Sequence, residues 1–240
     1  LLRAIPPHAR RAKPAFELKE WLVVSLPVSF AQFAGTAYRK VDVLMVGALL
    51  GPAEAGIYGV ATRLCELVQV GLSSVNTVAA PAMTAAYTRG GREPLQRAVV
   101  HANLGNLGVS MPILLGVLVL APFVLGFFGE EFAAGTWPLV VLLLAETINI
   151  LTGLCGLVCI MTNHQNVNAW VSVFNLALHI ALTYVFILML GLVGAALALV
   201  VTRLVVKGVL AIYIKLKLDI NPTCFSLLLL KEGRKLLGGA

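Results

Sequence analysis

Six long apolar stretches run through this chain of 240 residues, and each is long enough to cross a lipid bilayer as a helix. Each is bounded by glycine, proline or charged residues, and together they cover residues 21–50, 55–87, 95–127, 134–162, 168–190 and 193–217. A helix needs about 20 apolar residues to span the hydrocarbon layer, whereas membrane β-strands would be short alternating segments. The sequence therefore predicts an all-α, polytopic membrane protein with a bundle of six transmembrane helices.

The composition excludes a water-soluble globular domain. Hydrophobic residues make up 59% of the chain and charged residues 12%, whereas an average soluble domain is about half apolar and about a quarter charged. The cysteines, Cys65, Cys155, Cys159 and Cys224, are too few for a disulfide scaffold and lack the spacing of a zinc site. We expect them to pack between helices, and we expect neither a metal nor a cofactor.

Lysine and arginine gather on one side of the predicted topology. If the helices alternate in direction, one side receives the stretch before the first helix, the link between the second and third, and the stretch after the sixth. These three regions hold most of the 18 basic residues, and the opposite loops near 51–54, 129–132 and 191 hold none. The positive-inside rule then predicts that both termini are cytoplasmic. Because the basic residues are dispersed, the net charge of +7 favours a membrane topology over a nucleic-acid partner.

This pattern divides the chain into three parts. We expect a basic cytoplasmic linker over residues 1–20, the six-helix transmembrane lobe over 21–217 and a cytoplasmic or interfacial tail over 218–240. Residues 225–230 of the tail are apolar but too short to span a bilayer, which predicts an interfacial helix.

Ionisable residues interrupt the apolar stretches. They are Arg39, Lys40, Asp42, Arg63, Glu66, Glu146, Arg203 and Lys207. An ionisable side chain near the bilayer centre costs about 2.5–3.5 kcal/mol, so these residues must face one another, a partner or water. Helical projection also groups the polar residues of the second, fifth and sixth stretches on one face of each helix. The faces include Gln69, Asn76, Asn175 and His179. Three such faces predict a water-filled cavity.

Two interpretations stay open for several of these residues. Arg39 with Asp42 and Arg63 with Glu66 are spaced i, i+3, so each pair either neutralises itself locally or lines the cavity. Arg203 has no acid nearby in the sequence, which favours contact with a ligand or a second lobe.

The remaining ionisable residues are also ambiguous. Lys207 either reaches a ligand or extends towards the cytoplasmic interface. Glu146 is either the buried partner of an arginine or a carboxylate that binds a coupling ion. His179 is more often a hydrogen-bonded packing residue than a proton relay.

An excess of positive charge within the membrane favours an anionic ligand. Arginine binds phosphate or diphosphate through forked hydrogen bonds, and apolar surroundings suit a lipid tail. The chain contains no HExxH, Walker or GxSxG motif, so we expect a transporter and not an enzyme. A membrane phosphatase acting on polyprenyl diphosphates is an alternative, but its cluster of acidic residues is missing.

Several short motifs occur in an order that is similar to a known family. They are residues 41–47 (VDVLMVG), 51–52 (GP), 55–58 (AGIY), 61–64 (ATRL), Pro81 at the close of the second helix, 127–132 (FFGEEF), 161–162 (MT) and 191–196 (GLVGAA). The chain resembles the oligosaccharide-lipid flippases of the multidrug/oligosaccharidyl-lipid/polysaccharide exporter superfamily, over residues 16 to 220. It looks most like the C-terminal six-helix lobe. Asn163 stands where relatives often have glycine, which puts only the turn of that loop in question.

The resemblance implies a two-lobed exporter in the bacterial inner membrane that carries undecaprenyl-diphosphate-linked glycans for cell-surface polysaccharide. Arg39, Arg63 and Arg203 would hold the diphosphate while the lobes alternate. Because the family is normally a single chain and this chain has no initiating Met, we expect a fragment that lacks its N-terminal lobe; pairing of two copies is the alternative. A second possible function is a cation-coupled multidrug exporter of the same superfamily, with Glu146 or Asp42 binding H⁺ or Na⁺.

Overall fold

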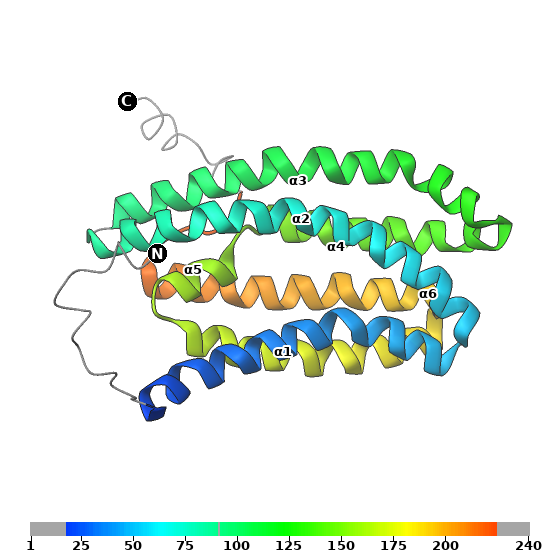
Figure 1. Ribbon diagram of the computed structural model, residues 1–240, viewed down its shortest axis with the longest axis horizontal. Coiled ribbons are helices and arrows are strands. Elements are labelled where there is room, and N and C mark those ends of the chain that lie inside the picture. The colour runs from blue at the N-terminus through cyan, green and yellow to red at the C-terminus, as the bar shows by residue number, and fades with distance from the viewer. Residues whose placement is uncertain (1–17, 91, 225–240) are drawn as a thin grey trace, which may run out of the picture.

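The structure is a computed structural model that describes residues 18–90 and 92–224. Over these residues it is helical and contains no strand, which confirms the predicted all-α class (Figure 1). The helices are α1 (Leu18–Leu49), α2 (Pro52–Thr88), α3 (Arg92–Phe128), the 3-10 helix η3 (Glu130–Gly135), α4 (Thr136–Leu151), α5 (Cys155–Met161) and α6 (Gln165–Leu218). Most of the predicted basic linker, and the predicted interfacial helix over 225–230, lie outside the described residues.

Helix α6 is a hairpin of two arms, which correspond to the fifth and sixth predicted spans. Gly191 has φ 60° and ψ −136°, a backbone conformation that only glycine adopts readily, and the chain reverses there. The first arm, 165–190, and the second arm, 192–218, lie side by side (Figure 1). Nδ1 of His179 lies 3.3 Å from Oγ1 of Thr202, which is 23 residues further on; in a straight helix these residues would be about 34 Å apart.

The fourth predicted span, 134–162, is broken rather than continuous. α4 ends at Leu151, α5 begins at Cys155, and the two helices are bent by 40°. Gly153 between them has φ 74°.

The expectation that Pro81 closes the second helix is also wrong, because Pro81 lies inside α2. Asn163 has φ 64°, and since asparagine tolerates the left-handed region well, it takes the place of glycine in that turn.

The helices have the apolar character of membrane spans. α3 and α6 are each long and apolar enough to cross a bilayer, and the bent pair α4–α5 gives a third candidate among the described residues. Large apolar side chains such as Phe127, Trp137 and Leu216 are exposed on the outside of the bundle. Outward apolar side chains on long helices are what a lipid environment favours. The chain is therefore an all-α polytopic membrane protein.

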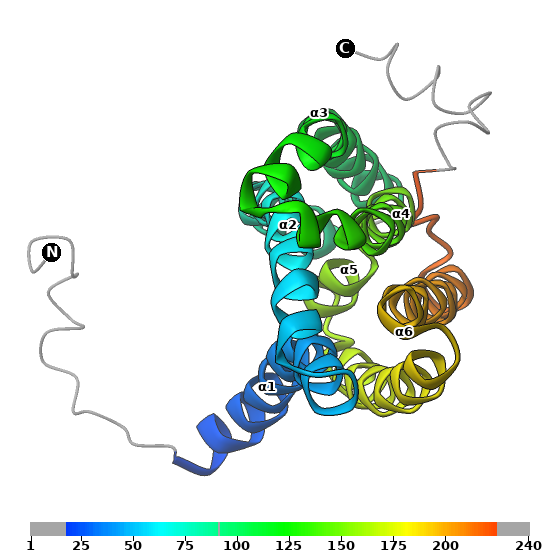
Figure 2. The same cartoon turned by 90° about the vertical axis from the view of Figure 1, so that its right-hand side faces the viewer.

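Both ends of the bundle can be followed in the ribbon. The start of α1, the α2–α3 turn, the α5–α6 turn and the end of α6 lie at one end (Figure 1). An end-on view places α3 at one edge of the bundle and α1 with the first arm of α6 at the other (Figure 2). Successive arms therefore alternate in direction, as the distribution of basic residues requires. That this end faces the cytoplasm stays a prediction.

Residues 219–224 form a strap across the break between α4 and α5. Asn103 of α3 accepts a hydrogen bond from the Leu154 N–H at 3.3 Å and donates one to the Pro222 carbonyl at 2.7 Å. The Cys224 N–H donates to the Leu151 carbonyl at 3.0 Å. Burial raises the pKa of the Cys224 thiol to about 11, so the thiol stays protonated and donates to the Ile150 carbonyl. The strap thus satisfies carbonyls that the end of α4 would otherwise leave unpaired.

We expect Asn103→Ala to destabilise the bundle by about 1–3 kcal/mol, because it leaves a buried N–H and a buried carbonyl without a partner. Asn103 is 1% exposed, so water cannot replace the lost side chain without rearrangement. Thermal unfolding of the purified protein in detergent measures the effect. Asn166→Ala, at an exposed position near the start of α6, is the control; equal unfolding temperatures for both variants would contradict the role assigned to Asn103.

Candidate functional site

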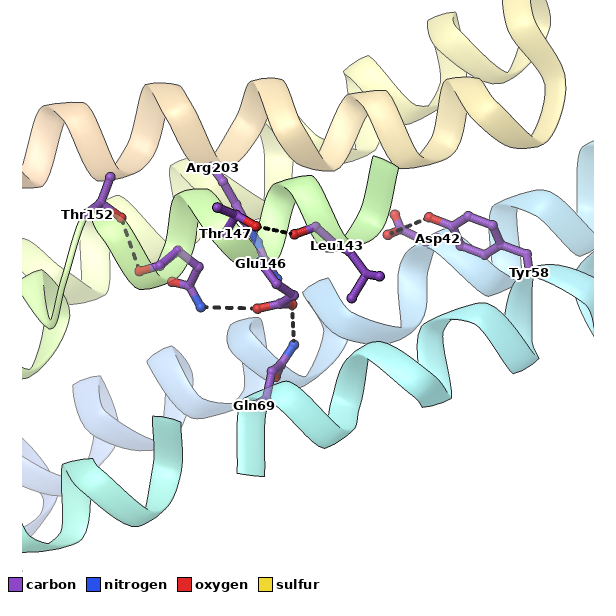
Figure 3. A network of polar contacts seen from close by, with 9 residues as sticks. Asp42, Tyr58, Gln69, Leu143, Glu146, Thr147, Thr152 and Arg203 are labelled. Carbon is purple, nitrogen blue, oxygen red and sulfur yellow. Dashed lines mark hydrogen bonds and ion pairs between the residues drawn. The ribbon is translucent and has the colours of Figure 1, made fainter. Parts of the chain in front are cut away.

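A buried ion pair lies in the middle of the bundle. Nη2 of Arg203, on the second arm of α6, donates to Oε1 of Glu146 on α4 at 2.7 Å, and their side chains are 10% and 2% exposed. Gln69 of α2 donates to the same oxygen at 3.0 Å, and Asn149 lies 3.4 Å from the other one. Figure 3 shows Gln69 and Arg203 approaching Glu146 from α2 and α6. Of the two interpretations of Glu146, the structure supports the partner of an arginine.

This contact identifies Arg203 as the arginine that Glu146 pairs with, which the sequence did not specify. The acid comes from another helix, 57 positions away in the sequence. The pair does not use all the donors of the guanidinium, which has five. Nη1 of Arg203 is buried, and the Tyr38 hydroxyl interacts with the same guanidinium. Tyr38 and Arg203 line both cavities of the bundle.

Two cavities meet at Arg203. The smaller one, the inner cavity, has a volume of about 40 Å³ and is lined by the acids Asp42, Glu66 and Glu146 together with Arg203. The larger one, the cationic cavity, has a volume of about 190 Å³. Its polar lining comes from Tyr38, Gln69, Asn149, Asn175, Arg203 and Lys207.

The lining of the cationic cavity contains two basic residues, of which Arg203 pairs with Glu146, and no carboxylate. Nζ of Lys207 lies 3.4 Å from the Gly153 carbonyl, at the break between α4 and α5. Oδ1 of Asn175 is buried without a hydrogen-bond partner in the described part of the chain. A group with both donors and acceptors, such as a protonated phosphate, could bind to these free atoms.

Two further basic residues predicted within the membrane, Arg63 and Lys40, do not line this cavity. Arg63 is 70% exposed and pairs with Glu66 at 2.8 Å, which is the local i, i+3 pair considered from the sequence. Lys40 approaches the same carboxylate at 3.4 Å. Exposed pairs of this kind contribute only about 0–1 kcal/mol. Arg39 lies on α1, but its side chain is outside the described residues.

Asp42 and His179 form a second buried polar group. Oδ1 of Asp42 is in contact with Nε2 of His179, and the Thr183 hydroxyl lies 3.5 Å from the same oxygen. The Tyr58 hydroxyl lies 3.5 Å from the other carboxylate oxygen (Figure 3). The Tyr38 ring, which lines both cavities, packs on His179 with 4.5 Å between ring centroids, and Asp42 itself lines the inner cavity.

The polar face predicted on α2 exists, but only part of it reaches the cavities. Gln69 lines both cavities and Glu66 lines the inner one. Ser73, Thr77 and other hydroxyl residues are exposed and donate to carbonyls of their own helix. Asn76 lies on the same face, and its Oδ1 is buried without a described partner.

Several residues of the site were not identified from the sequence. Tyr38 lines both cavities, and Thr202 contacts His179. An aromatic residue and a threonine in an apolar stretch carry no distinctive signal. On α3, by contrast, Asn103, Asn106 and Ser110 are spaced i, i+3, i+7, and this spacing indicates the buried polar face that the structure contains.

Comparison with known proteins gives a match to a family model and to a curated relative. A family model described as "Polysaccharide biosynthesis protein" matches residues 10–87. The "Probable low-salt glycan biosynthesis flippase Agl15" of Haloferax volcanii is 22% identical over 193 residues, which are 80% of this chain and 40% of the relative.

Comparison with solved structures shows that the fold is similar to that of known transporters. An outward-facing multidrug resistance MATE family transporter of the MOP superfamily matches with a TM-score of 0.70 and 21% identity, over 82% of this chain and 45% of that one. A MATE structure in the bent conformation matches with a TM-score of 0.70 and 20% identity over the same shares. The chain thus spans less than half the length of these proteins. Together the matches confirm the resemblance that the motifs indicated, to a polysaccharide or oligosaccharide-lipid flippase family of this superfamily.

Proposed function

We propose that this chain forms one lobe of an exporter of the multidrug/oligosaccharidyl-lipid/polysaccharide exporter superfamily, and that the exporter flips a lipid-linked oligosaccharide across the membrane. The observation that carries the proposal is the cationic cavity, where Arg203 and Lys207 line a space of about 190 Å³ without a facing carboxylate. The names of the relatives describe flippases and transporters, which supports export in place of catalysis.

The charge of the cavity favours a diphosphate as the group that binds there. The guanidinium of Arg203 and the side-chain amine of Lys207 are donors for phosphate oxygens, and charge-assisted bonds of this type are strong inside a protein. A cationic drug would find fewer unpaired acidic side chains to bind in these cavities. The acids of the inner cavity already have partners: Glu146 pairs with Arg203, Glu66 with Lys40.

An apolar groove supports the lipid part of the proposed substrate. It lies between α2 and α3, has a volume of about 590 Å³ and is lined mainly by small apolar side chains, from Val75 and Ala79 on α2 to Ala102 and Val109 on α3. A polyprenyl chain can lie along such a surface while its diphosphate enters the bundle. The glycan would follow the diphosphate through the polar region.

Export by alternating access requires a second body around the site. The proposed partner is another six-helix lobe, either in the same polypeptide or in a second copy of this chain. The exposed hydroxyl residues on α2, including Ser73 and Thr77, support this because they are poor neighbours for lipid. We propose the bacterial inner membrane as the location, with the basic end of the bundle and both termini in the cytoplasm.

Binding and export measurements with charge variants test the proposal. We expect a polyprenyl diphosphate to stabilise the purified protein against thermal unfolding. Lys207→Gln should weaken this binding by about ten- to hundredfold, since one charge-assisted hydrogen bond contributes about 1.5–3 kcal/mol. Arg203→Lys keeps the charge beside Glu146 but loses the forked geometry, so it should abolish glycan export in cells while the protein still inserts.

Arg63→Gln is the matched control, because it removes one positive charge outside the cationic cavity. It should leave binding and export unchanged. The proposal is wrong if a neutral polyprenol binds as tightly as the diphosphate, or if Lys207→Gln and Arg203→Lys export glycan at the wild-type rate. Extrusion of a cationic drug that Glu146→Gln abolishes would favour the multidrug exporter instead.

A further inference from the structure

The peptide bond between Gly153 and Leu154 is in contact with both α3 and α6. Its N–H, on Leu154, donates to Oδ1 of Asn103 on α3 at 3.3 Å. Its carbonyl, on Gly153, lies 3.4 Å from Nζ of Lys207, which lines the cationic cavity. Both contacts therefore act on one planar unit, in which the N–H and the carbonyl point in opposite directions. A side chain that fixes the N–H also fixes the direction of the carbonyl.

Asn103 is itself held in one orientation by the strap. Its Nδ2 donates to the Pro222 carbonyl at 2.7 Å. Because a carbonyl only accepts hydrogen bonds, the side-chain amide must turn its nitrogen towards Pro222 and its oxygen towards the Leu154 N–H. Asn103 is 1% exposed, so water does not compete for either bond. The strap thus determines which way the amide of Asn103 faces, and with it the peptide bond.

Gly153 packs directly against the same two groups. Its φ of 74° lies in the left-handed region, which favours glycine. A Cβ atom at this position would lie 2.3 Å from the Pro222 carbonyl oxygen and 2.7 Å from Oδ1 of Asn103. Without these neighbours the backbone of a glycine rotates readily, because glycine has access to many conformations. The direction of the Gly153 carbonyl therefore depends on Asn103 and the strap.

The strap is attached to α3 near the start of that helix. Nη1 of Arg92 pairs with Oδ2 of Asp219 at 2.5 Å. The side chain of Gln96 accepts a hydrogen bond from the Asn221 N–H at 2.9 Å and donates one to the Asn221 carbonyl at 3.1 Å. These contacts form a continuous path from the basic end of the bundle, through the strap and Asn103, to the wall of the cationic cavity.

The Gly153 carbonyl limits where the side-chain amine of Lys207 can lie. A lysine side chain is long and flexible, and ordering such a side chain on binding lowers the affinity by about two- to tenfold. The amine has more than one N–H, so it can donate to Gly153 and to a ligand at the same time. A ligand that meets an amine already held at the cavity wall avoids that loss of affinity.

We propose that Asn103 and the strap are positioning elements for Lys207. They hold the peptide bond between Gly153 and Leu154 so that its carbonyl keeps the amine at the wall of the cationic cavity. Asn103 does not line this cavity and acts through the peptide bond. Loosening the strap then frees the amine, although the strap lies outside the cavity. The consequence for ligand binding rests on the proposed function, whereas the effect on Lys207 itself does not.

The reactivity of the Lys207 amine tests the positioning without any ligand. Purified protein in detergent is treated with acetic anhydride, and mass spectrometry of its peptides measures the rate of acetylation at each lysine. Lys40, whose side chain is 49% exposed, is the reference in the same sample. We expect Asn103→Ala to raise the rate at Lys207, relative to Lys40, by about two- to tenfold, because the Gly153 carbonyl no longer holds the amine.

Two further variants separate positioning from a general loss of stability. Gln96→Ala removes both hydrogen bonds to Asn221 and loosens the strap, so it should also raise the rate at Lys207. Val117→Ala truncates a buried apolar side chain further along α3. It should lower the unfolding temperature but leave the rate at Lys207 unchanged.

Binding of farnesyl diphosphate, a short polyprenyl diphosphate, tests the consequence for the ligand. Asn103→Ala should weaken this binding by about two- to tenfold when Lys207 is present. In the Lys207→Gln background it should have no effect, since the amine that Asn103 positions is absent. A purely structural role of Asn103 would weaken binding equally in both backgrounds.

The proposal is overturned if Asn103→Ala leaves the acetylation rate at Lys207 unchanged, or if Val117→Ala raises that rate as much. Should Asn103→Ala fail to fold, the same criteria apply to Gln96→Ala. Equal weakening of binding with and without the Lys207 amine also overturns it. If the wild-type protein binds no diphosphate, the proposed function fails, while the acetylation rates still decide whether the strap positions Lys207.

Discussion

Replacing Glu146 by alanine is expected to destabilise the bundle by about 3–5 kcal/mol, because it leaves the positive charge of Arg203 buried without its partner. The Arg203 side chain is only 10% exposed, so the charge cannot reach water without disturbing the contact between α4 and α6. Gln69 and Asn149 also lose their acceptor on Glu146. Thermal unfolding of the purified variant in detergent measures the loss.

Glu66→Ala provides the matched control, because Glu66 forms ion pairs with Lys40 and Arg63 at the surface. Exposed pairs contribute about 0–1 kcal/mol, so this variant should unfold close to the wild-type temperature. The double variant Glu146→Ala/Arg203→Met should recover much of the stability, because it removes the uncompensated charge. An equal effect of Glu146→Ala and Glu66→Ala, or no recovery in the double variant, would show that the buried pair does not stabilise the bundle.

The arrangement of helices could be predicted because its main determinant is local. Length and apolarity are properties of each stretch by itself, so all six helical arms were expected, and Gly191 separates the last two as it does in the structure. The break at Gly153 was missed. It depends on Asn103 and on the Pro222 carbonyl, which approach from distant parts of the sequence.

The polar faces could be predicted from helical periodicity, but their partners could not. The spacing of polar residues placed Gln69 on one face of α2 and His179 on one face of α6; Gln69 lines both cavities and His179 is buried. Pairing depends on the way the helices pack. The arginine that pairs with Glu146 was therefore not specified, and Asp42 proved to contact His179, 137 residues away.

These pairs also explain why a cationic bundle keeps few free charges. Glu146 pairs with Arg203 and Glu66 with Lys40, each from another part of the chain, and Lys207 is left facing a carbonyl in the cationic cavity. The surplus positive charge is thereby concentrated at one place in the interior. A ligand with negative charge gains most at that place, since the low dielectric of the surroundings strengthens the attraction.

Gly194→Ala is expected to disrupt the α6 hairpin and to lower the free energy of unfolding by about 3 kcal/mol or more. This loss lies at or above the upper end of the losses that overpacked positions usually show. A Cβ atom on Gly194 would lie 1.9 Å from the Phe186 carbonyl oxygen and 2.4 Å from its carbon, so a backbone would have to move. Separating the two arms would also break the contact of His179 with Thr202, and with it the junction to α1.

Gly208→Ala on the same arm is the matched control, because nothing lies within 4 Å of the added Cβ there. Alanine favours a helix over glycine by about 0.5–1 kcal/mol, so this variant should unfold at the wild-type temperature or slightly above it. Thermal unfolding of the purified proteins in detergent measures both variants. If Gly194→Ala is as stable as Gly208→Ala, the arms do not pack as closely as the structure describes, and the buried link between α1 and α6 loses its support.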